Sequence, residues 1–356
     1  MAKEAPSTPG NSGSEPGTER SAESAKQFSE VPVYFATDRK RTDSVGADGR
    51  FGPERNLEGD YLSYGRAIVT IPKTHQTGMV ERPVWWRFEF REDPKKHVTM
   101  MEPVLMTPET FYAEMRESTG VAPQKELLMF VHGFNVPYAD AMRRTGQISY
   151  DLGFGGVSFC YSWPSQGDVT KYPVDKENSE WTTPHLAKVL NDLQKETQFE
   201  KVHIIAHSMG TRVLSYALRS AQDAGFNLRL NNVILAAPDI DADIFKEQIL
   251  PKIKGSTQRL TMYASSGDQA LNLSMRFNGS RRLGLSGDGL VVVPDLMDTV
   301  DASGIDTSLI GHSYYGSQGP VVQDLFKLVI KGLVPRQRDL RPGTLGEWEL
   351  PAPQPQ

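Results

Sequence analysis

The apolar and polar positions divide the chain into two patterns. Before residue 125, short apolar runs and one alternation of period two, over residues 84–91, predict β-strands. From residue 126, continuous apolar runs alternate with segments whose apolar residues recur every three or four positions. Strands are expected at 127–131, 157–161, 202–206, 233–237, 260–264 and 297–302, and helices over 138–152, from 183, over 209–219 and over 321–330. This alternation predicts an α/β fold with a mostly parallel sheet and helices on both faces.

The two ends of the chain differ from this pattern. Residues 1–30 are rich in Ser, Glu, Pro and Gly, and we expect them to be disordered. Residues 335–356 are Pro-rich and are expected to form an extended or disordered tail. Residues 31–334 then predict one domain, made of a β-rich N-terminal part (31–125) and a catalytic core (126–334).

Composition excludes several classes of protein. The chain has 356 residues, of which 38% are hydrophobic, which is enough for a sizeable core, but no apolar run is long enough for a transmembrane helix. The N-terminus shows no secretory signal, so a cytoplasmic location is expected for the sequence as given, or a secreted or periplasmic one if a targeting segment was removed. The net charge of −5, without a long basic run, argues against a nucleic-acid binder.

The residue types that can bind metals, Cys and His, are scattered along the chain. Cys160 is the one cysteine and lies in an apolar predicted strand, so we expect an inert core residue and no intrachain disulfide. The seven histidines form no metal-binding spacing, and no Gly-rich phosphate loop follows a strand. The sequence therefore predicts neither a metal nor a cofactor.

The strongest chemical signal is a serine between a predicted strand and a predicted helix. Residues 206–210 read Ala-His-Ser-Met-Gly, the A-x-S-x-G form of a nucleophile elbow. Such a turn holds its serine in a strained backbone conformation, and we expect the small Ala206 and Gly210 to be needed where the chain approaches itself. Ser208 is the predicted nucleophile.

A serine nucleophile needs a base and an acid that orients the base. In this arrangement the chain order is Ser, then Asp or Glu, then His. His312 is the one histidine after Ser208, and it lies between the last predicted strand and the closing helix. We favour Asp268, in the Ser/Gly-rich loop after strand 260–264, as the acid; Asp239, after strand 233–237, is the alternative.

The oxyanion hole is expected from two backbone N–H groups. Met209 follows the nucleophile, and Phe134 follows Gly133 at the end of strand 127–131. Loops at the carboxyl edge of the sheet also carry aromatic residues that are candidates for substrate binding, namely Trp163, Tyr172 and Tyr314. Residues 164–176 and 274–289 are candidate lid or rim segments, and no strongly amphipathic apolar lid helix is evident, which favours a soluble ester.

Together these motifs resemble the α/β-hydrolase superfamily. The segments VHGFN, SWPSQG, HIIAHSMGTRVL, ILAAPDID, YASSGDQAL and GHSYY are similar to those of its bacterial branch described as "alpha/beta hydrolase of unknown function". The resemblance covers roughly residues 30–332. It implies an eight-stranded, mostly parallel sheet, a Ser208–Asp268–His312 triad and esterase- or lipase-like activity.

The function predicted from these residues is hydrolysis of a small-molecule or polymeric carboxylic ester. Ser208 would form an acyl-enzyme, with His312 as base and Asp268 as the orienting acid. The same triad also fits an amidase, a thioesterase or an acyltransferase. A catalytically silent interaction protein with this fold is the non-enzyme alternative.

Overall fold

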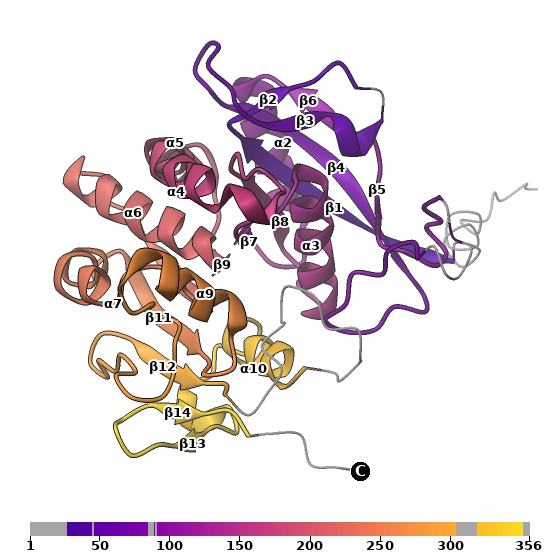
Figure 1. The fold of residues 1–356 in the computed structure, drawn as a ribbon. Coiled ribbons are helices and arrows are strands. Elements are labelled where there is room, and N and C mark those ends of the chain that lie inside the picture. The colour runs from indigo at the N-terminus through magenta and orange to yellow at the C-terminus, as the bar shows by residue number, and fades with distance from the viewer. Residues whose placement is uncertain (1–26, 45, 85–88, 90, 304–318, 352–356) are drawn as a thin grey trace, which may run out of the picture.

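The computed structural model describes residues 27–44, 46–84, 89, 91–303 and 319–351. Their main feature is a twelve-stranded sheet (Figure 1). Eight of these strands are parallel, in the spatial order β14 (Trp348–Glu349), β12 (Asp298–Asp301), β11 (Thr257–Ala264), β10 (Leu230–Ala236), β9 (Lys201–His207), β7 (Glu126–Val131), β8 (Val157–Ser162) and β1 (Phe28–Thr37). The predicted mostly parallel sheet is confirmed, and antiparallel strands extend it at both edges.

The β-rich N-terminal part joins this same sheet. β1 lies parallel to β8, and β4 (Ser63–Pro72) pairs with β1 in antiparallel fashion. β5 (Thr99–Met100) and β6 (Val104–Met106) add to β4, while β2 (Arg39–Arg41) and β3 (Phe51–Arg55) form a separate ribbon. The strand predicted over 84–91 lies largely outside the described residues.

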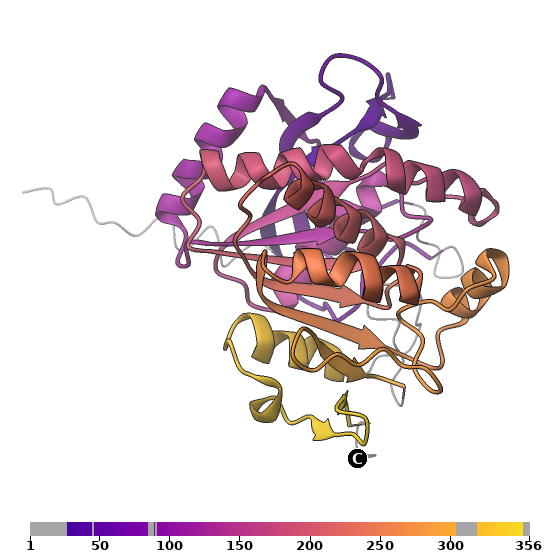
Figure 2. The ribbon, with the colours of Figure 1, turned by 90° about the vertical axis from the view of Figure 1, so that its left-hand side faces the viewer.

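Helices cover both faces of the sheet, as the two views in Figures 1 and 2 show. Alternate residues of each strand point to opposite faces. On one face, Leu128 and Phe130 of β7 pack in one apolar cluster with α10 (Pro320–Val329) and the end of α3 (Tyr138–Asp151). On the other, Leu127, Met129 and Val131 pack with α2 (Pro108–Val121), α5 (Thr183–Glu196) and α6 (Met209–Asp223). The sheet is therefore the middle of three layers.

Two further helices follow strands at the carboxyl edge. α4 (Tyr172–Trp181) comes after β8, and α9 (Gln269–Asn278) comes after β11. Between β10 and β11 the chain forms α7 (Ala242–Ile244), a π-helical turn (Phe245–Ile249) and α8 (Leu250–Ile253). None of the helices in the described part of the chain is long and apolar enough to span a membrane.

The C-terminal segment departs from its predicted form. Its described part, residues 335–351, returns to the sheet and adds β14 beside β12 and β13 (Arg341–Pro342) beside β14. Leu340 and Leu350 are buried in the cluster that contains α10. These apolar side chains, spaced among the prolines, give the segment a surface to bury, so this part of the expected extended or disordered tail is an ordered edge of the sheet.

Candidate active site

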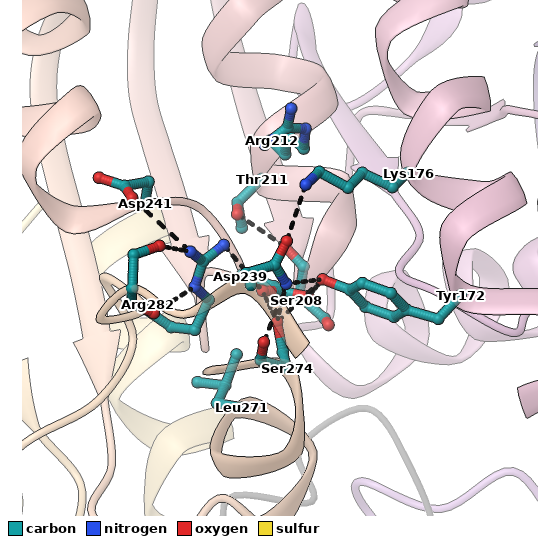
Figure 3. Close-up of polar contacts among 12 residues, drawn as sticks. Tyr172, Lys176, Ser208, Thr211, Arg212, Asp239, Asp241, Leu271, Ser274 and Arg282 are labelled. Carbon is teal, nitrogen blue, oxygen red and sulfur yellow. Dashed lines mark hydrogen bonds and ion pairs between the residues drawn. The ribbon is translucent and has the colours of Figure 1, made fainter. Parts of the chain in front are cut away.

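The predicted nucleophile lies at a strained turn between β9 and α6. Ser208 has φ 48° and ψ −123°, a backbone conformation that non-glycine residues rarely adopt and that costs about 1–3 kcal/mol. Its N–H donates to the carbonyl of Ala236 (2.9 Å), and its own carbonyl accepts from the N–H of Asp239 (3.2 Å) and from Oγ1 of Thr211 (2.6 Å). Hydrogen bonds to β10, to the loop after it and to α6 therefore keep Ser208 in this strained conformation. Figure 3 shows Thr211 of α6 and Asp239 of the loop around Ser208.

Two glycines permit this close packing. A β-carbon on Gly210 would lie 2.3 Å from the carbonyl oxygen of His132 and 2.6 Å from that of Val131. The last position of the A-x-S-x-G pattern is therefore glycine because the end of β7 packs against it. From the sequence, the close approach was expected between Gly210 and Ala206. A β-carbon on Gly133 would lie 3.0 Å from Cβ of Ser208, so the loop after β7 touches the nucleophile.

The two predicted oxyanion donors belong to these two segments. Phe134 follows Gly133 in the loop after β7, and Met209 is the first residue of α6. The first N–H groups of a helix have no partner within the helix. Neither of these two N–H groups has an acceptor among the described residues. Both are therefore free to bind an oxygen next to Ser208.

The loop after β7 is supported by a buried cation that the sequence argument missed. Arg39 is 1% exposed, and its guanidinium donates to the carbonyls of Val136 (2.7 Å) and Ser165 (2.9 Å) and to Oγ of Ser162 (2.9 Å). Burial lowers the pKa of Arg39 to about 10, so it stays charged at neutral pH. In the sequence, Arg39 is one of several charged residues after the first predicted strand, and nothing there sets it apart.

A second support is the stacked pair of His132 and Trp163. Their rings are 5.1 Å apart and nearly parallel, and the indole N–H donates to the carbonyl of His132 (2.7 Å). Burial, together with the charge of Arg39, lowers the pKa of His132 well below its usual value, so the ring is neutral. Trp163 is fully buried. We therefore assign it to support of this loop rather than to the substrate-binding set in which the sequence placed it.

A third support comes from α4. The carboxylate of Asp175 accepts from Oγ of Ser165 (2.6 Å), from the N–H of Gln166 (2.7 Å) and, at 3.4 Å, from the N–H of Asn135. Burial raises the pKa of this carboxyl, while these three donors favour its charged form. Asp175 was also not predicted from the sequence, because it lies in the first turn of α4, 40 residues away from Asn135 in the loop it holds.

The favoured acid, Asp268, is the N-cap of α9. Its Oδ1 accepts from the N–H of Leu271 (2.9 Å), and its second oxygen has no hydrogen-bond partner within the described part of the chain. In the same loop, the N–H of Ser266 donates to Oγ of Ser303 (2.9 Å), the last described residue before 304–318. The predicted base His312, like Tyr314, lies in that segment and so outside the described residues.

The alternative acid, Asp239, lies beside the nucleophile, and both of its carboxylate oxygens already accept hydrogen bonds. It is 3% exposed, its Oδ2 accepts from the hydroxyl of Tyr172 (2.9 Å), and its Oδ1 accepts from Oγ of Ser274 (2.5 Å). Arg282 lies 3.8 Å from Oδ1. Burial raises the pKa of Asp239, and the two hydroxyls and Arg282 counteract that rise in part. Figure 3 shows this group beside Ser208.

These contacts join α4 to α9 across Asp239. Nδ2 of Asn278 donates to the hydroxyl of Tyr172 (3.1 Å), and Nζ of Lys176 donates to Oδ1 of Asn278 (2.8 Å). We call Tyr172, Lys176, Asp239, Ser274 and Asn278 the α4–α9 bridge. The structure thus places the predicted substrate-binding residue Tyr172 at the side of the elbow, where its ring meets that of Phe134 edge-on at 5.3 Å.

One histidine borders the serine but is unsuited to act as its base. Burial and the nearby charge of Arg144 lower the pKa of His207 to about 3, so the ring is neutral and a poor proton acceptor at pH 7. Across residues 27–303 and 319–351, apart from the gaps given above, no group of three or more His, Cys, Asp or Glu side chains could hold a metal ion.

Comparisons with known proteins give several distant likenesses. An uncharacterized protein, alr1448, from Nostoc sp. (strain PCC 7120) is 30% identical over 66 residues, which are 18% of this chain and 17% of that protein's length. Among solved structures, a protein assigned as a cell surface hydrolase from Lactobacillus plantarum WCFS1 covers 61% of this chain and 96% of its own, with 13% identity and a TM-score of 0.37. Trichoderma reesei cutinase in complex with a phosphonate inhibitor covers 41% and 68%, with 13% identity and a TM-score of 0.25.

The family of the chain is shown by a family model. The model described as "Alpha/beta hydrolase of unknown function (DUF900)" matches residues 108–328, which run from the start of α2 almost to the end of α10 and include the elbow. That span is more than half of the chain. The chain belongs to the DUF900 family of alpha/beta hydrolases.

Proposed function

We propose that the protein is a serine hydrolase that cleaves carboxylic esters through an acyl-enzyme on Ser208. The observation that carries the proposal is the elbow itself. A strained serine at the end of a central strand faces a glycine loop whose next N–H has no acceptor among the described residues, and the first N–H of α6 has none there either. A purely structural turn has no need for this combination of strain and unpaired donors.

The proposed mechanism combines this elbow with the base, His312, that the sequence predicts. Oγ of Ser208 attacks the ester carbonyl while His312 takes the hydroxyl proton, and the resulting oxyanion accepts from the N–H groups of Phe134 and Met209. His312 then gives the proton to the leaving alkoxide, which departs as the alcohol. Water, deprotonated by His312, attacks the acyl-enzyme and releases the carboxylic acid and free Ser208.

We propose Asp268 as the acid that orients His312. Its second carboxylate oxygen is unused among the described residues, and its loop contacts Ser303, where the chain enters the segment that holds His312. Asp239 is less suited, because both of its oxygens already accept hydroxyl hydrogen bonds and it is almost completely buried. At Asp239 an imidazole would have to share an oxygen with one of these hydroxyls in a buried site, whereas Asp268 offers an oxygen that accepts nothing from the described residues.

The proposal is tested by hydrolysis assays on matched ester, thioester and amide substrates of p-nitrophenol, thiophenol and p-nitroaniline. Wild type should cleave the esters fastest, and Ser208→Ala should reduce kcat by at least about 10³-fold. Ser44→Ala, an exposed serine between β2 and β3, is the control and should match wild type. Ester hydrolysis that persists in Ser208→Ala would refute the nucleophile, and faster cleavage of the amide would refute the substrate class.

A further inference from the structure

A row of three aromatic rings leads from the oxyanion loop to the surface. The ring of Phe134 meets that of Tyr172 edge-on, with centroids 5.3 Å apart. The ring of Tyr172 in turn stacks on that of Phe277, with centroids 6.1 Å apart and planes 18° from parallel. Phe134 and Tyr172 are half-buried, whereas Phe277 is 69% exposed. The row therefore begins beside Gly133, against Ser208, and ends in solvent.

The exposed end of the row is wider than one ring. Leu273, one turn before Phe277 on α9, is 54% exposed, and residues four apart share a helix face. Single exposed apolar residues are ordinary. Here two of them lie on one face of one helix, and Phe277 connects through ring contacts to the proposed active site, which distinguishes a binding surface from scattered exposure.

The α4–α9 bridge fixes this row in place. The hydroxyl of Tyr172 is held by Asp239, Ser274 and Asn278, so the ring that links Phe134 to Phe277 cannot swing away without breaking buried hydrogen bonds. Lys176 ties the next turn of α4 to Asn278, the residue that follows Phe277. A preorganised apolar surface loses little conformational entropy when a ligand binds to it.

We propose that the row Phe134–Tyr172–Phe277, with Leu273, binds the apolar arm of the ester substrate. The favoured substrates are then esters with an extended alkyl or aryl arm, cleaved one molecule at a time. This inference rests on the proposed function, because the arm is placed by the bond that Ser208 attacks. An extended apolar arm fits better than a lipid surface, because the row runs inward to the nucleophile and its inner two rings are half-buried.

The test is a chain-length series of p-nitrophenyl esters below their critical micelle concentrations. In wild type, kcat/KM should rise from acetate through butyrate to octanoate, by up to about fourfold for each methylene that becomes buried. Phe277→Ala should lower the octanoate-to-acetate ratio of kcat/KM by at least about fivefold, and adding Leu273→Ala should lower it further. Leu345→Ala is the control, since Leu345 is 65% exposed between β13 and β14 at the far edge of the sheet, and it should leave the ratio unchanged.

Three outcomes overturn the inference. A flat or falling wild-type series with Ser208-dependent cleavage of acetate refutes it while the proposed function stands. Equal ratios in Phe277→Ala and Leu345→Ala also refute it. Cosedimentation of wild type with phosphatidylcholine vesicles that Phe277→Ala abolishes, together with a flat series, assigns the row to a membrane surface instead. Absence of cleavage for every ester is a different failure, because it refutes the proposed function itself.

Discussion

The two halves of the proposed site are built in different ways. At the ends of β7, β9 and β10, three non-glycine residues have positive φ, namely Asn135 (59°), Ser208 (48°) and Ala237 (47°), and buried groups such as Arg39 and Asp175 hold the surrounding loop. At the end of β11, Asp268 is half-buried and held as an ordinary helix N-cap.

The difference reflects what each half does. A nucleophile and two oxyanion donors must be fixed before the reaction, since catalysis by preorganised dipoles requires that they do not move when charge develops. Strain and buried polar contacts supply that rigidity. An orienting carboxylate needs only to aim one oxygen at an imidazole, which a capped loop can do. We expect perturbations of the first half to reduce both stability and activity, and those of the second half to reduce activity alone.

Among the variants that compare the two halves, we expect the largest loss of kcat from Asp268→Asn. The amide keeps the shape and the cap but favours the wrong tautomer of the base, a change worth about 10⁴ in kcat in the serine-protease precedent. We expect kcat on an activated ester to fall at least about 10²-fold with an unchanged melting temperature. Asp239→Asn should lose less than about tenfold, and Asp243→Asn, exposed on α7, should match wild type.

The opposite ranking of the two variants would assign the orienting acid to Asp239. If Asp239→Asn is inactive while Asp268→Asn keeps most of its activity, with both variants folded by circular dichroism, the orienting acid follows β10. The base would then have to bind Asp239 beside, or in place of, the hydroxyl groups of the α4–α9 bridge.

A smaller effect on rate, joined to one on stability, is expected from Arg39→Met. Methionine fills much of the same volume but leaves the carbonyls of Val136 and Ser165 without their donor. We expect the free energy of unfolding to fall by about 2–4 kcal/mol and kcat to fall about tenfold. Arg41→Met, at an exposed neighbouring position, is the matched control, and equal behaviour of the two variants would mean that the oxyanion loop does not depend on its buried cation.

The pH dependence of kcat/KM should show one ascending limb. The base must be neutral to accept the proton of Ser208, so the rate should rise through a pKa near the usual histidine value of about 6.5. His207 and His132 are already neutral across this range, because burial depresses their pKa values, and so cannot produce the limb. A profile that is flat from pH 5 to 9, for a substrate whose chemical step is slow, would contradict a histidine base.

The smallest effect on activity is expected from His75→Gln, which tests stability away from the site. Burial alone would lower the pKa of His75, but hydrogen bonds to Asp151 (2.8 Å) and Glu81 (2.9 Å) raise it to about 9. Because the folded pKa exceeds the unfolded one, the stabilisation is complete below about pH 6.5 and is lost as pH rises through 9. Between pH 6.5 and 9.5, the free energy of urea unfolding should fall by about 1–3 kcal/mol more in wild type than in His75→Gln. Equal pH dependence in the two proteins would show that the contacts of His75 with Asp151 and Glu81 do not stabilise the fold.

Local patterns predicted most of the parallel sheet and the elbow. The strands over 202–206 and 260–264 and the helix from 209 lie within one to four residues of the observed bounds, because each has its own apolar period. Ser208 was predictable because the turn demands a residue pattern that is visible within five positions. Arg39 and Asp175 were not, because their partners in the loop after β7, Val136 and Asn135, lie 97 and 40 residues away in the chain, and no local pattern records such a contact.

The absence of a local pattern also explains why two elements, β14 and α9, were not predicted. The C-terminal strand β14 has two residues and pairs with β12 across nearly fifty positions, so its sequence carries no period. Helix α9 was overlooked because Leu273 and Phe277 are exposed, so its apolar residues do not fall on the single buried face that a periodic pattern requires.

The central claim is that Ser208 is an activated nucleophile, and covalent labelling tests it most directly. Wild type would be incubated with a fluorophosphonate probe, digested and mapped by mass spectrometry. We expect stoichiometric, irreversible labelling of Ser208, none in Ser208→Ala, and much slower labelling in Asp268→Asn. A protein that is folded but unlabelled, or a label that maps to another residue, would contradict it.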